Sequence, residues 1–279
     1  MGAGYLFLAA ALWGLLGPVA RLAFQEGLSP LEVAFYRAVL AWPLFLFHAL
    51  RLRRIRVEGR DLPWILLFGL VGVSLFYGAY QLAVGRAGAA LASILLYTAP
   101  AWVALFSRLF LREPLGPRGG VALALTLLGV GLIGWGGEAR PDPLGIAFGL
   151  LAGFSYALYY LFGKVFLPRY ATPTLFAYLL PVGALGLLPF LKPHPLSLLA
   201  LGAVGFLALF STYGAYLAYY AGLRRMPATR ASVLATLEPV VAAGVAYLWW
   251  GERLPPWGYL GAGLILLAVL LTLAPQRPR

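Results

Sequence analysis

A glutamate and an arginine stand inside long apolar stretches of the chain, where charged side chains are rare. Glu238 lies halfway along the apolar run 228–250, and Arg37 lies six residues inside the run 31–50. An ionised side chain in such a position is expensive unless it faces protein, water or a counter-ion. Glu238 could therefore exchange a proton against a solute. Arg37 could bind an anionic group or balance the charge of Glu238.

Both residues also have a structural interpretation. Glu238 could stay protonated, or form a buried structural hydrogen bond beside Pro239. Arg37 lies about 9 Å along a helix from the nearer end of its run, so its long side chain could also extend towards that end. Only the functional interpretation predicts altered solute affinity in Arg37→Ala, and only it predicts that Glu238→Gln no longer responds to a proton gradient.

The composition requires a lipid environment. Of the 279 residues, 62% are hydrophobic and 11% are charged, whereas soluble domains carry about 25% charged residues. A bilayer core takes about 20 helical residues to cross, and strict alternation of the membrane β-strand kind is absent, so the spans should be helices. We expect an all-α integral membrane protein forming a single membrane domain, 1–279. Its ten transmembrane helices should lie near 4–24, 31–50, 63–84, 88–110, 118–136, 143–163, 174–191, 196–221, 228–250 and 256–274.

The basic residues indicate how the chain is oriented. The net charge is +12, but the Lys and Arg residues form short clusters between apolar runs, which is typical of topology signals rather than of a nucleic-acid surface. The loops of one side, which hold the cluster 51–60, carry fifteen of the 21 basic residues, and the other side carries five. We therefore expect a multi-pass protein of the cell inner (plasma) membrane with both termini in the cytoplasm.

The chain repeats itself. A shift of 139 residues matches Tyr80 with Tyr219, Arg86 with Arg225, Ser93 with Ser232, Pro100 with Pro239 and Glu113 with Glu252. The repeats predicted from this duplication are 4–136 and 143–274. Five helices in each copy is an odd number, so the second copy should enter the membrane upside down. This predicts two inverted five-helix repeats around a central cavity, an arrangement found in many secondary transporters.

Several short motifs resemble a known family. The second copy contains RMPATRAS from Arg225, LEPVVA from Leu237 and WGERL from Trp250, and the first copy contains FYRA, YTAP and LREPL. Together they resemble the signature of EamA-type carriers of the drug/metabolite transporter superfamily over the full length. The resemblance implies a ten-helix exporter of small metabolites, amino acids or drugs. The first copy has Ala99 where the second has Glu238, so an acidic role there would belong to one half.

Further residues could complete the lining of a midplane cavity. Pro100 and Pro239 should bend equivalent helices and free backbone groups that only protein or a wet cavity can satisfy, although each could be a simple kink. Tyrosines recur at helical spacing within three spans, where they could line a cavity or serve ordinary packing. The candidate substrate-binding residues are Trp13, Arg37, Tyr77, Tyr80, Gln81, Tyr97, Trp102, Tyr156, Tyr159, Tyr213, Tyr216, Ser232 and Thr236, with Glu238 as the candidate proton-coupling residue.

Two other features have mainly structural interpretations. Gly145, Gly149 and Gly153 form a ridge of small residues that favours close helix packing. Glu113 and Glu252 end equivalent helices at opposite membrane faces, where they could help to close the cavity, cap the next helix or pair with a neighbouring arginine.

The function predicted is a secondary transporter that works by alternating access, with a small-molecule substrate and the lipid bilayer as its partners and protons as a candidate third. No phosphate-binding loop of the G-x-x-x-x-G-K-[ST] type occurs, so the chain cannot hydrolyse ATP by that route. An intramembrane enzyme is disfavoured because no paired membrane carboxylates or metal-ligand spacing occur, and we expect no catalytic residues, metal or cofactor. A channel or lipid scramblase also fits the composition.

Overall fold

Helices make up every long element of the computed structural model, which describes residues 2–87, 89–135, 142–192, 195–251 and 253–273. Within these residues ten spans are long and apolar enough to cross a membrane, and no strand is assigned. The prediction of an all-α integral membrane fold with ten spanning helices is therefore confirmed. The ends of the two predicted repeats, Gly136 and Ala274, lie outside the described residues.

The first five spans are built from nine helical segments. The first span consists of α1 (Gly2–Gly14) and α2 (Leu16–Gln25), and the second is α3 (Pro30–Arg51). The third contains α4 (Leu62–Gly69), the π-helix η1 (Leu70–Leu75) and α5 (Phe76–Ala87). The fourth contains α6 (Ala89–Leu96) and α7 (Ala99–Leu109), and the fifth is α8 (Pro117–Gly134).

The last five spans follow a similar plan. The sixth is α9 (Pro143–Phe166), and the seventh is α10 (Thr172–Leu187) extended by the 3₁₀ turn η2 (Leu188–Phe190). The eighth contains α11 (Leu198–Phe206), the π-helix η3 (Leu207–Gly214) and α12 (Ala215–Leu223). The ninth contains α13 (Ala228–Ala235) and α14 (Glu238–Trp250), and the tenth is α15 (Pro256–Leu273). Both halves thus carry a π-helix in their third span and an interruption in their fourth.

Local sequence signals set where several of these helices begin. Ser29 and Glu32 form a reciprocal capping box at the start of α3, and Asp142 accepts a hydrogen bond from the backbone of Gly145 at the start of α9. Prolines occupy the first turn of α3, α8 and α9, where the missing N–H has no helical partner to lose. At the other end of α14, Gly251 adopts the left-handed conformation that closes many helices.

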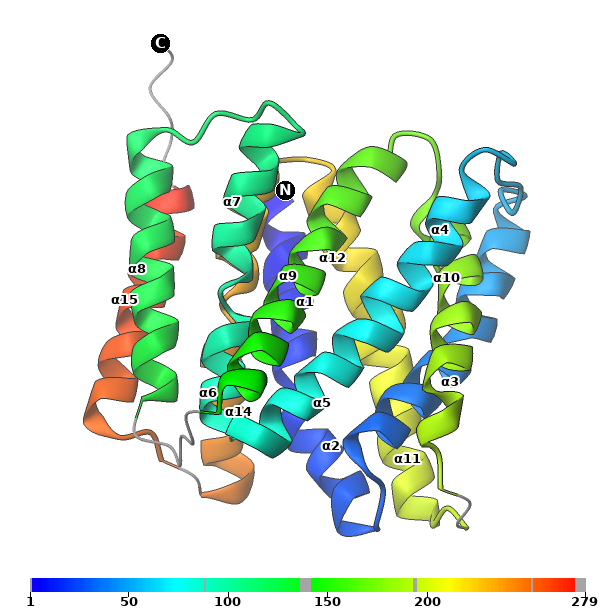
Figure 1. Cartoon of the computed structure of the whole chain (residues 1–279), viewed down its shortest axis with the longest axis horizontal. Helices are drawn as coiled ribbons and strands as arrows, with labels where there is room; N and C mark the ends of the chain where they lie inside the picture. Colours follow the sequence, from blue (N-terminus) through cyan, green and yellow to red (C-terminus); the bar gives the residue numbers. More distant parts are fainter. Residues whose placement is uncertain (1, 88, 136–141, 193–194, 252, 274–279) are drawn as a thin grey trace.

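The two halves of the chain pack into each other (Figure 1). The second span contacts the seventh through α3 and α10, and the fifth contacts the tenth through α8 and α15. The first span packs on the eighth and ninth through α1, α12 and α14, while the sixth packs on the third and fourth through α9, α5 and α6. Each of these contacts therefore has a counterpart when the halves are exchanged.

The bundle has two ends, which we name from the termini. The terminal face carries the start of α1 and the end of α15, at the top of Figure 1, together with the loop between α3 and α4. The opposite face carries the ends of α2, α5, α8 and α14.

The glycine ridge on α9 is a packing surface. A Cβ atom added at Gly145 would lie 2.9 Å from the Cβ of Ala87, and one at Gly149 would lie 2.6 Å from the Leu95 side chain. At Gly153 it would lie 2.6 Å from the backbone oxygen of Leu95. The absence of side chains on this ridge lets the sixth span approach the third and fourth.

Candidate functional site

A cavity of about 530 Å³ lies among the spanning helices. Its lining comes from both halves of the chain. The first half contributes α1, α2, α3, α5, α6 and α8, and the second half contributes α9, α12 and α14. The structure brings together here many of the residues selected from the sequence: Trp13, Arg37, Tyr77, Tyr80, Tyr97, Tyr156, Tyr216, Glu238 and Pro239.

The cavity extends from the middle of the bundle to the opposite face. Tyr156 and Glu238, which lie midway along their spans, mark its inner part. Arg21, Gly134 and Trp250, which lie near the ends of α2, α8 and α14, mark its outer part. The site is therefore reached from the face that does not carry the termini.

Arg37 is buried, with 4% of its surface exposed, and is held by two hydrogen bonds. Its Nε donates to the hydroxyl of Thr212 at 3.1 Å, and one terminal nitrogen donates to the hydroxyl of Tyr77 at 2.8 Å. Thr212 belongs to the π-helix η3, a kind of irregularity that is frequent at functional sites. The guanidinium thus lines the cavity in a fixed position instead of extending to the end of its helix.

Glu238 is the first residue of α14 and lines the same cavity. Its carboxyl group interacts with the hydroxyl of Tyr97, and its charge lies close enough to Arg37 for the two to attract. The helix N-terminus adds a favourable field, because the first backbone N–H groups of a helix carry partial positive charge. Glu238 is half-buried, since one side of it faces the cavity.

Interruptions of two helices place these residues. In the fourth span α6 ends at Leu96 and α7 begins at Ala99, and in the ninth α13 ends at Ala235 and α14 begins at Glu238. Pro100 and Pro239 each sit in the first turn of the new segment, where a proline is well tolerated. The chain breaks just before each proline, which leaves Tyr97 in one break and Glu238 directly after the other.

Aromatic rings form much of the remaining wall. Phe76 stacks on Tyr156 with ring centroids 5.6 Å apart, and Trp13 meets Tyr216 edge to face at 5.5 Å. The hydroxyl of Tyr80 lies 3.1 Å from that of Ser93. Such a wall is apolar over the ring faces and polar at the hydroxyls, which suits a small solute with both kinds of surface.

Four of the candidate residues have partners outside the cavity lining. Tyr159 donates to the backbone oxygen of Gly72 at 2.6 Å, and Tyr213 bonds to Nδ1 of His48 at 2.8 Å. The hydroxyls of Ser232 and Thr236 donate to backbone oxygens three residues earlier in α13, at 2.8 and 2.5 Å. These bonds tie helices together or satisfy backbone groups at the interruption.

The other candidates also lie apart from the lining. Trp102 packs edge to face against Phe154, with ring centroids 5.6 Å apart. Gln81 is half-buried next to Tyr80, and Pro100 is buried at the start of α7. The proposed part of Trp102 and Gln81 in substrate binding and that of Pro100 as a helix kink stay predictions.

The outer part of the cavity contains residues that the sequence analysis missed. Along α14, the residues that follow Glu238 at a spacing of four share its face and also line the cavity: Ala242, Ala246 and Trp250. This spacing is visible in the sequence and could have predicted that these residues line the cavity together with Glu238. The guanidinium of Arg21 lies 4.3 Å from the centroid of the Trp250 ring, a cation–π contact across the outer part of the cavity. In the sequence, Arg21 is one of the five basic residues assigned to the loops of the less basic side.

On the terminal face, away from the opening of the cavity, Glu113 joins the two halves of the chain. One carboxylate oxygen accepts a 2.7 Å hydrogen bond from the backbone nitrogen of Ala228, and the other lies 3.3 Å from Nζ of Lys164. Lys164 also donates to the backbone oxygen of Met226 at 2.6 Å. Glu113 thus caps α13 in the other half of the chain, whereas the sequence interpretation had it cap the next helix, which is α8. Its counterpart Glu252 lies outside the described residues.

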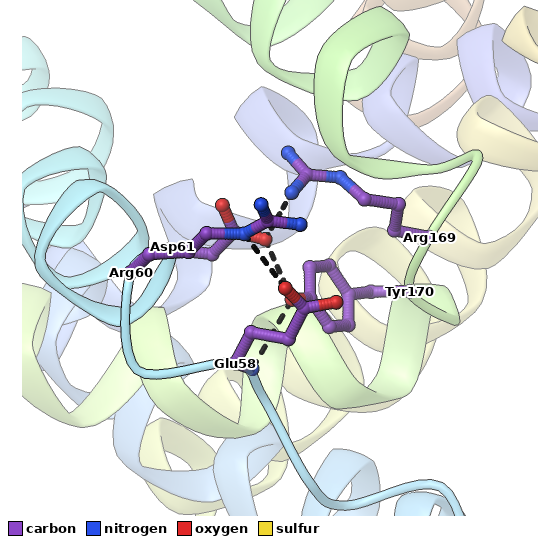
Figure 2. A network of polar contacts seen from close by, with 5 residues as sticks. All are labelled: Glu58, Arg60, Asp61, Arg169 and Tyr170. Carbon is purple, nitrogen blue, oxygen red and sulfur yellow. Dashed lines mark hydrogen bonds and ion pairs between the residues drawn. The ribbon is translucent and has the colours of Figure 1, made fainter.

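A second polar network joins the halves on the terminal face (Figure 2). Asp61 accepts hydrogen bonds from Arg169 and, at 2.6 Å, from the hydroxyl of Tyr170, which itself accepts from the backbone nitrogen of Glu58 at 3.2 Å. The bond from Tyr170 holds the pKa of Asp61 below its ordinary value against the effect of burial, and Arg169 lowers it further. Glu58 pairs with Arg60 at 2.7 Å.

Metal-binding geometry is not found in the described part of the chain, which holds no group of three or more His, Cys, Asp or Glu residues placed to share an ion. The chemistry available in the cavity is therefore that of the Glu238 carboxyl group, the guanidinium groups of Arg37 in the inner part and Arg21 in the outer part, and several hydroxyls.

Comparison with known proteins identifies the family. The model of the EamA-like transporter family matches the chain twice, over residues 1–135 and 143–274. The chain belongs to this family. An uncharacterized transporter of Archaeoglobus fulgidus is 31% identical over 270 residues, covering 95% of this chain and 96% of the relative. This EamA-family chain is a multi-pass membrane transporter.

A second relative has a more specific description. It is a probable terminal-alkyne amino-acid exporter of Streptantibioticus cattleyicolor, 26% identical over 95% of this chain and 91% of that protein. A solved crystal structure matches 98% of this chain and 96% of its own with a TM-score of 0.84 at 17% identity, which supports the fold.

Proposed function

We propose that the protein is a secondary carrier that exports small zwitterionic metabolites such as amino acids. The observation that carries this proposal is the presence of Arg37 and Glu238, from different helices, in one aromatic cavity of about 530 Å³. A guanidinium binds a carboxylate through parallel hydrogen bonds, and a carboxylate binds an ammonium group. The volume lies within the range of small-molecule sites.

Proton coupling would follow from the same carboxyl group. A proton and the ammonium group of a substrate would compete for Glu238, so that binding of one releases the other. Such competition is sufficient for exchange of substrate against protons, provided that the cavity opens to one side at a time.

Alternating access would use the two halves and their interrupted helices. With the arginine-rich terminal face in the cytoplasm of a cell with an inner (plasma) membrane, the conformation described above faces outward. The inverted five-helix repeats would rock about the cavity, and the breaks before Pro100 and Pro239 would act as hinges. Release of Glu113 from Ala228 and Lys164 would open the cytoplasmic side. Export as the direction rests on the family and on the relative named as an amino-acid exporter.

The experiment that tests this proposal is counterflow in proteoliposomes. A panel of amino acids should be compared with the matching amines and with the matching acids that lack the amino group. We expect saturable exchange of certain amino acids and weak exchange of both truncated analogues. A proton gradient should accelerate uphill transport in the wild type and in Glu26→Gln, whose acid lies at the exposed end of the first span, but not in Glu238→Gln.

Other outcomes would point elsewhere. Flux that does not saturate indicates a channel, and loss of lipid asymmetry without solute exchange indicates a scramblase. Conversion of a solute into a product would indicate an intramembrane enzyme. Exchange that ignores the gradient and survives Glu238→Gln would make Glu238 structural while leaving the carrier itself in place.

A further inference from the structure

A second cavity, of about 650 Å³, lies on the terminal face away from the transport site. Its lining includes Arg53, Arg54 and Arg56 from the loop between α3 and α4, with Arg169 on the other side. Four guanidinium groups around one hollow make a site for an anion with several oxygens.

The loop that carries these arginines is fixed in place. The hydroxyl of Thr174 donates to the backbone oxygen of Arg54, and the hydroxyl of Tyr178 donates to that of Ile55 at 3.0 Å. At the far end of the loop, Tyr170 and Arg169 hold Asp61. The arginines are therefore presented by an ordered loop, which reduces the entropy lost when they bind a ligand.

Arg53 occupies an unusual backbone conformation. Its φ of 54° lies in the left-handed region, and Arg54 N–H bonds to the Ala49 oxygen, so Arg53 stands where a helix-ending glycine is usual. This conformation is unfavourable for a residue with a Cβ atom.

Unlike Arg169, which pairs with Asp61, the loop residues Arg53, Arg54 and Arg56 have no acidic partner in the described part of the chain. Three acids belong to the terminal face, and each is engaged: Glu58 by Arg60, Asp61 by Arg169 and Glu113 by Lys164. Burial, and then the charges of Arg225 and Arg54, lower the pKa of Arg224 behind this loop. The surroundings of the cavity are thus strongly positive.

The cavity is continuous with the lipid-facing surface of α3. Leu50 lines it, and Leu50 and Phe47 are 52% and 63% exposed. Because α3 spans the membrane, these side chains lie where acyl chains run. A ligand with a phosphate head and an apolar tail would satisfy both surfaces, whereas free phosphate would use only the arginines.

We propose that this cavity binds the phosphate-bearing head group of an anionic phospholipid, with the acyl chains along Phe47 and Leu50. The site is separate from the transport cavity and does not depend on which solute is carried. Basic pockets on the cytoplasmic side of membrane proteins offer this chemistry, and each arginine that reaches the bound head group should contribute about fivefold in affinity.

The test is lipid binding to the purified full-length protein in an uncharged detergent, measured by native mass spectrometry. Phosphatidylglycerol and phosphatidylcholine with identical acyl chains are titrated against wild type, Arg54→Gln/Arg56→Gln and Arg108→Gln/Arg225→Gln. The last variant removes the same charge from the same face but leaves the cavity lining intact. Size-exclusion and thermal unfolding profiles confirm that each variant is folded.

We expect the wild type to prefer phosphatidylglycerol. The Arg54/Arg56 variant should lose about 25-fold in affinity and the preference with it, while the control variant keeps most of both. Inorganic phosphate at equal ionic strength should displace little lipid. Equal losses in the two variants, or no loss in either, would overturn the site. Displacement of lipid by phosphate alone would overturn the lipid assignment in favour of a soluble phosphate compound.

Discussion

The Glu113 carboxylate accepts a 2.7 Å hydrogen bond from the backbone nitrogen of Ala228 and so joins the end of the fourth span to the start of the ninth. Both of these spans are interrupted beside the transport cavity. An anionic side chain at a helix N-terminus is favourable in itself. Here it also holds the two interrupted spans together on the closed side.

Replacing Glu113 should loosen this closed side. Glu113→Ala leaves the first turn of α13 uncapped and Lys164 without its acid, which together should lower the stability of the closed contact by about 1–2 kcal/mol. The chain has no cysteine, so a single Ser232→Cys reporter can be used. Ser232 is 1% exposed in α13. Its labelling by a membrane-impermeant maleimide should become about five- to thirtyfold faster in Glu113→Ala.

The matched control for this experiment is Glu58→Ala, which removes an acid from an exposed ion pair on the same face. It should leave the labelling of Ser232→Cys unchanged, because exposed pairs contribute little. If Glu113→Ala also leaves labelling unchanged, the contact does not hold the terminal side closed.

Arg37 should control substrate affinity through its fixed position. Arg37→Gln removes the charge and both donated bonds, and a charged hydrogen bond contributes about 1.5–3 kcal/mol. We expect KM for counterflow to rise about ten- to a hundredfold. Arg37→Lys keeps the charge but not the forked geometry that reaches both Thr212 and Tyr77. Its KM should therefore lie between that of the wild type and that of Arg37→Gln.

Thr212→Val separates the charge of Arg37 from its positioning. It removes the 3.1 Å bond to Nε while leaving the guanidinium and Tyr77 in place. We expect a rise in KM of less than tenfold. Wild-type kinetics in a normally expressed Arg37→Gln protein would remove Arg37 from the substrate site.

The fold and part of the site could be predicted from the sequence because lipid imposes strong rules. Apolar runs of membrane length gave ten spans within a few residues of the observed ends. Charges inside such runs selected Arg37 and Glu238, both of which line the cavity. A buried charge is conspicuous in a sequence, since few positions tolerate one.

Tyrosine spacing was a weaker guide, for a physical reason. Tyr156 lines the cavity whereas Tyr159, three residues on, bonds to Gly72 on another helix. Both lie on one face of α9, and only the neighbouring helices decide which of them meets open space. The π-helix that presents Thr212 was likewise beyond prediction, because it depends on how η3 packs on α1 and α3.

Asp61 makes the stability of the protein depend on pH in acid solution. Its pKa in the folded protein is lowered by the bonds from Tyr170 and Arg169. The group therefore stabilises the fold fully above its unfolded pKa of about 4, and this contribution is lost as the pH falls through the lower folded value. Below both values the wild type should gain nothing from the carboxylate.

The measurement is thermal unfolding of the wild type and Asp61→Asn in detergent between pH 7 and pH 3. We expect a lower Tm for Asp61→Asn at pH 7, and the two curves should begin to converge as the pH falls below about 4. Glu58→Gln serves as the control and should follow the wild type throughout, because its ion pair is exposed. A Tm difference that is the same at every pH would show that Asn disturbs packing rather than the ionic network.

Close packing of the sixth span on the fourth should make Gly153 intolerant of any side chain. The Cβ atom of Gly153→Ala would lie 2.6 Å from the Leu95 oxygen and 2.7 Å from the Thr98 hydroxyl. The Leu95 oxygen is backbone and cannot move aside without moving the interruption that holds Tyr97. We expect a loss of stability of about 1–3 kcal/mol and, because the cavity wall shifts with it, impaired counterflow.

Gly244→Ala is the matched comparison for this prediction. Gly244 also lies inside a spanning helix, α14, but an added Cβ atom would meet nothing within 4 Å. Alanine is the better helix former, so this variant should gain about 0.5–1 kcal/mol and transport as the wild type does. Thermal unfolding and counterflow on both variants test the pair. If Gly153→Ala is as stable and active as Gly244→Ala, the sixth span does not need its close approach to the break before Pro100.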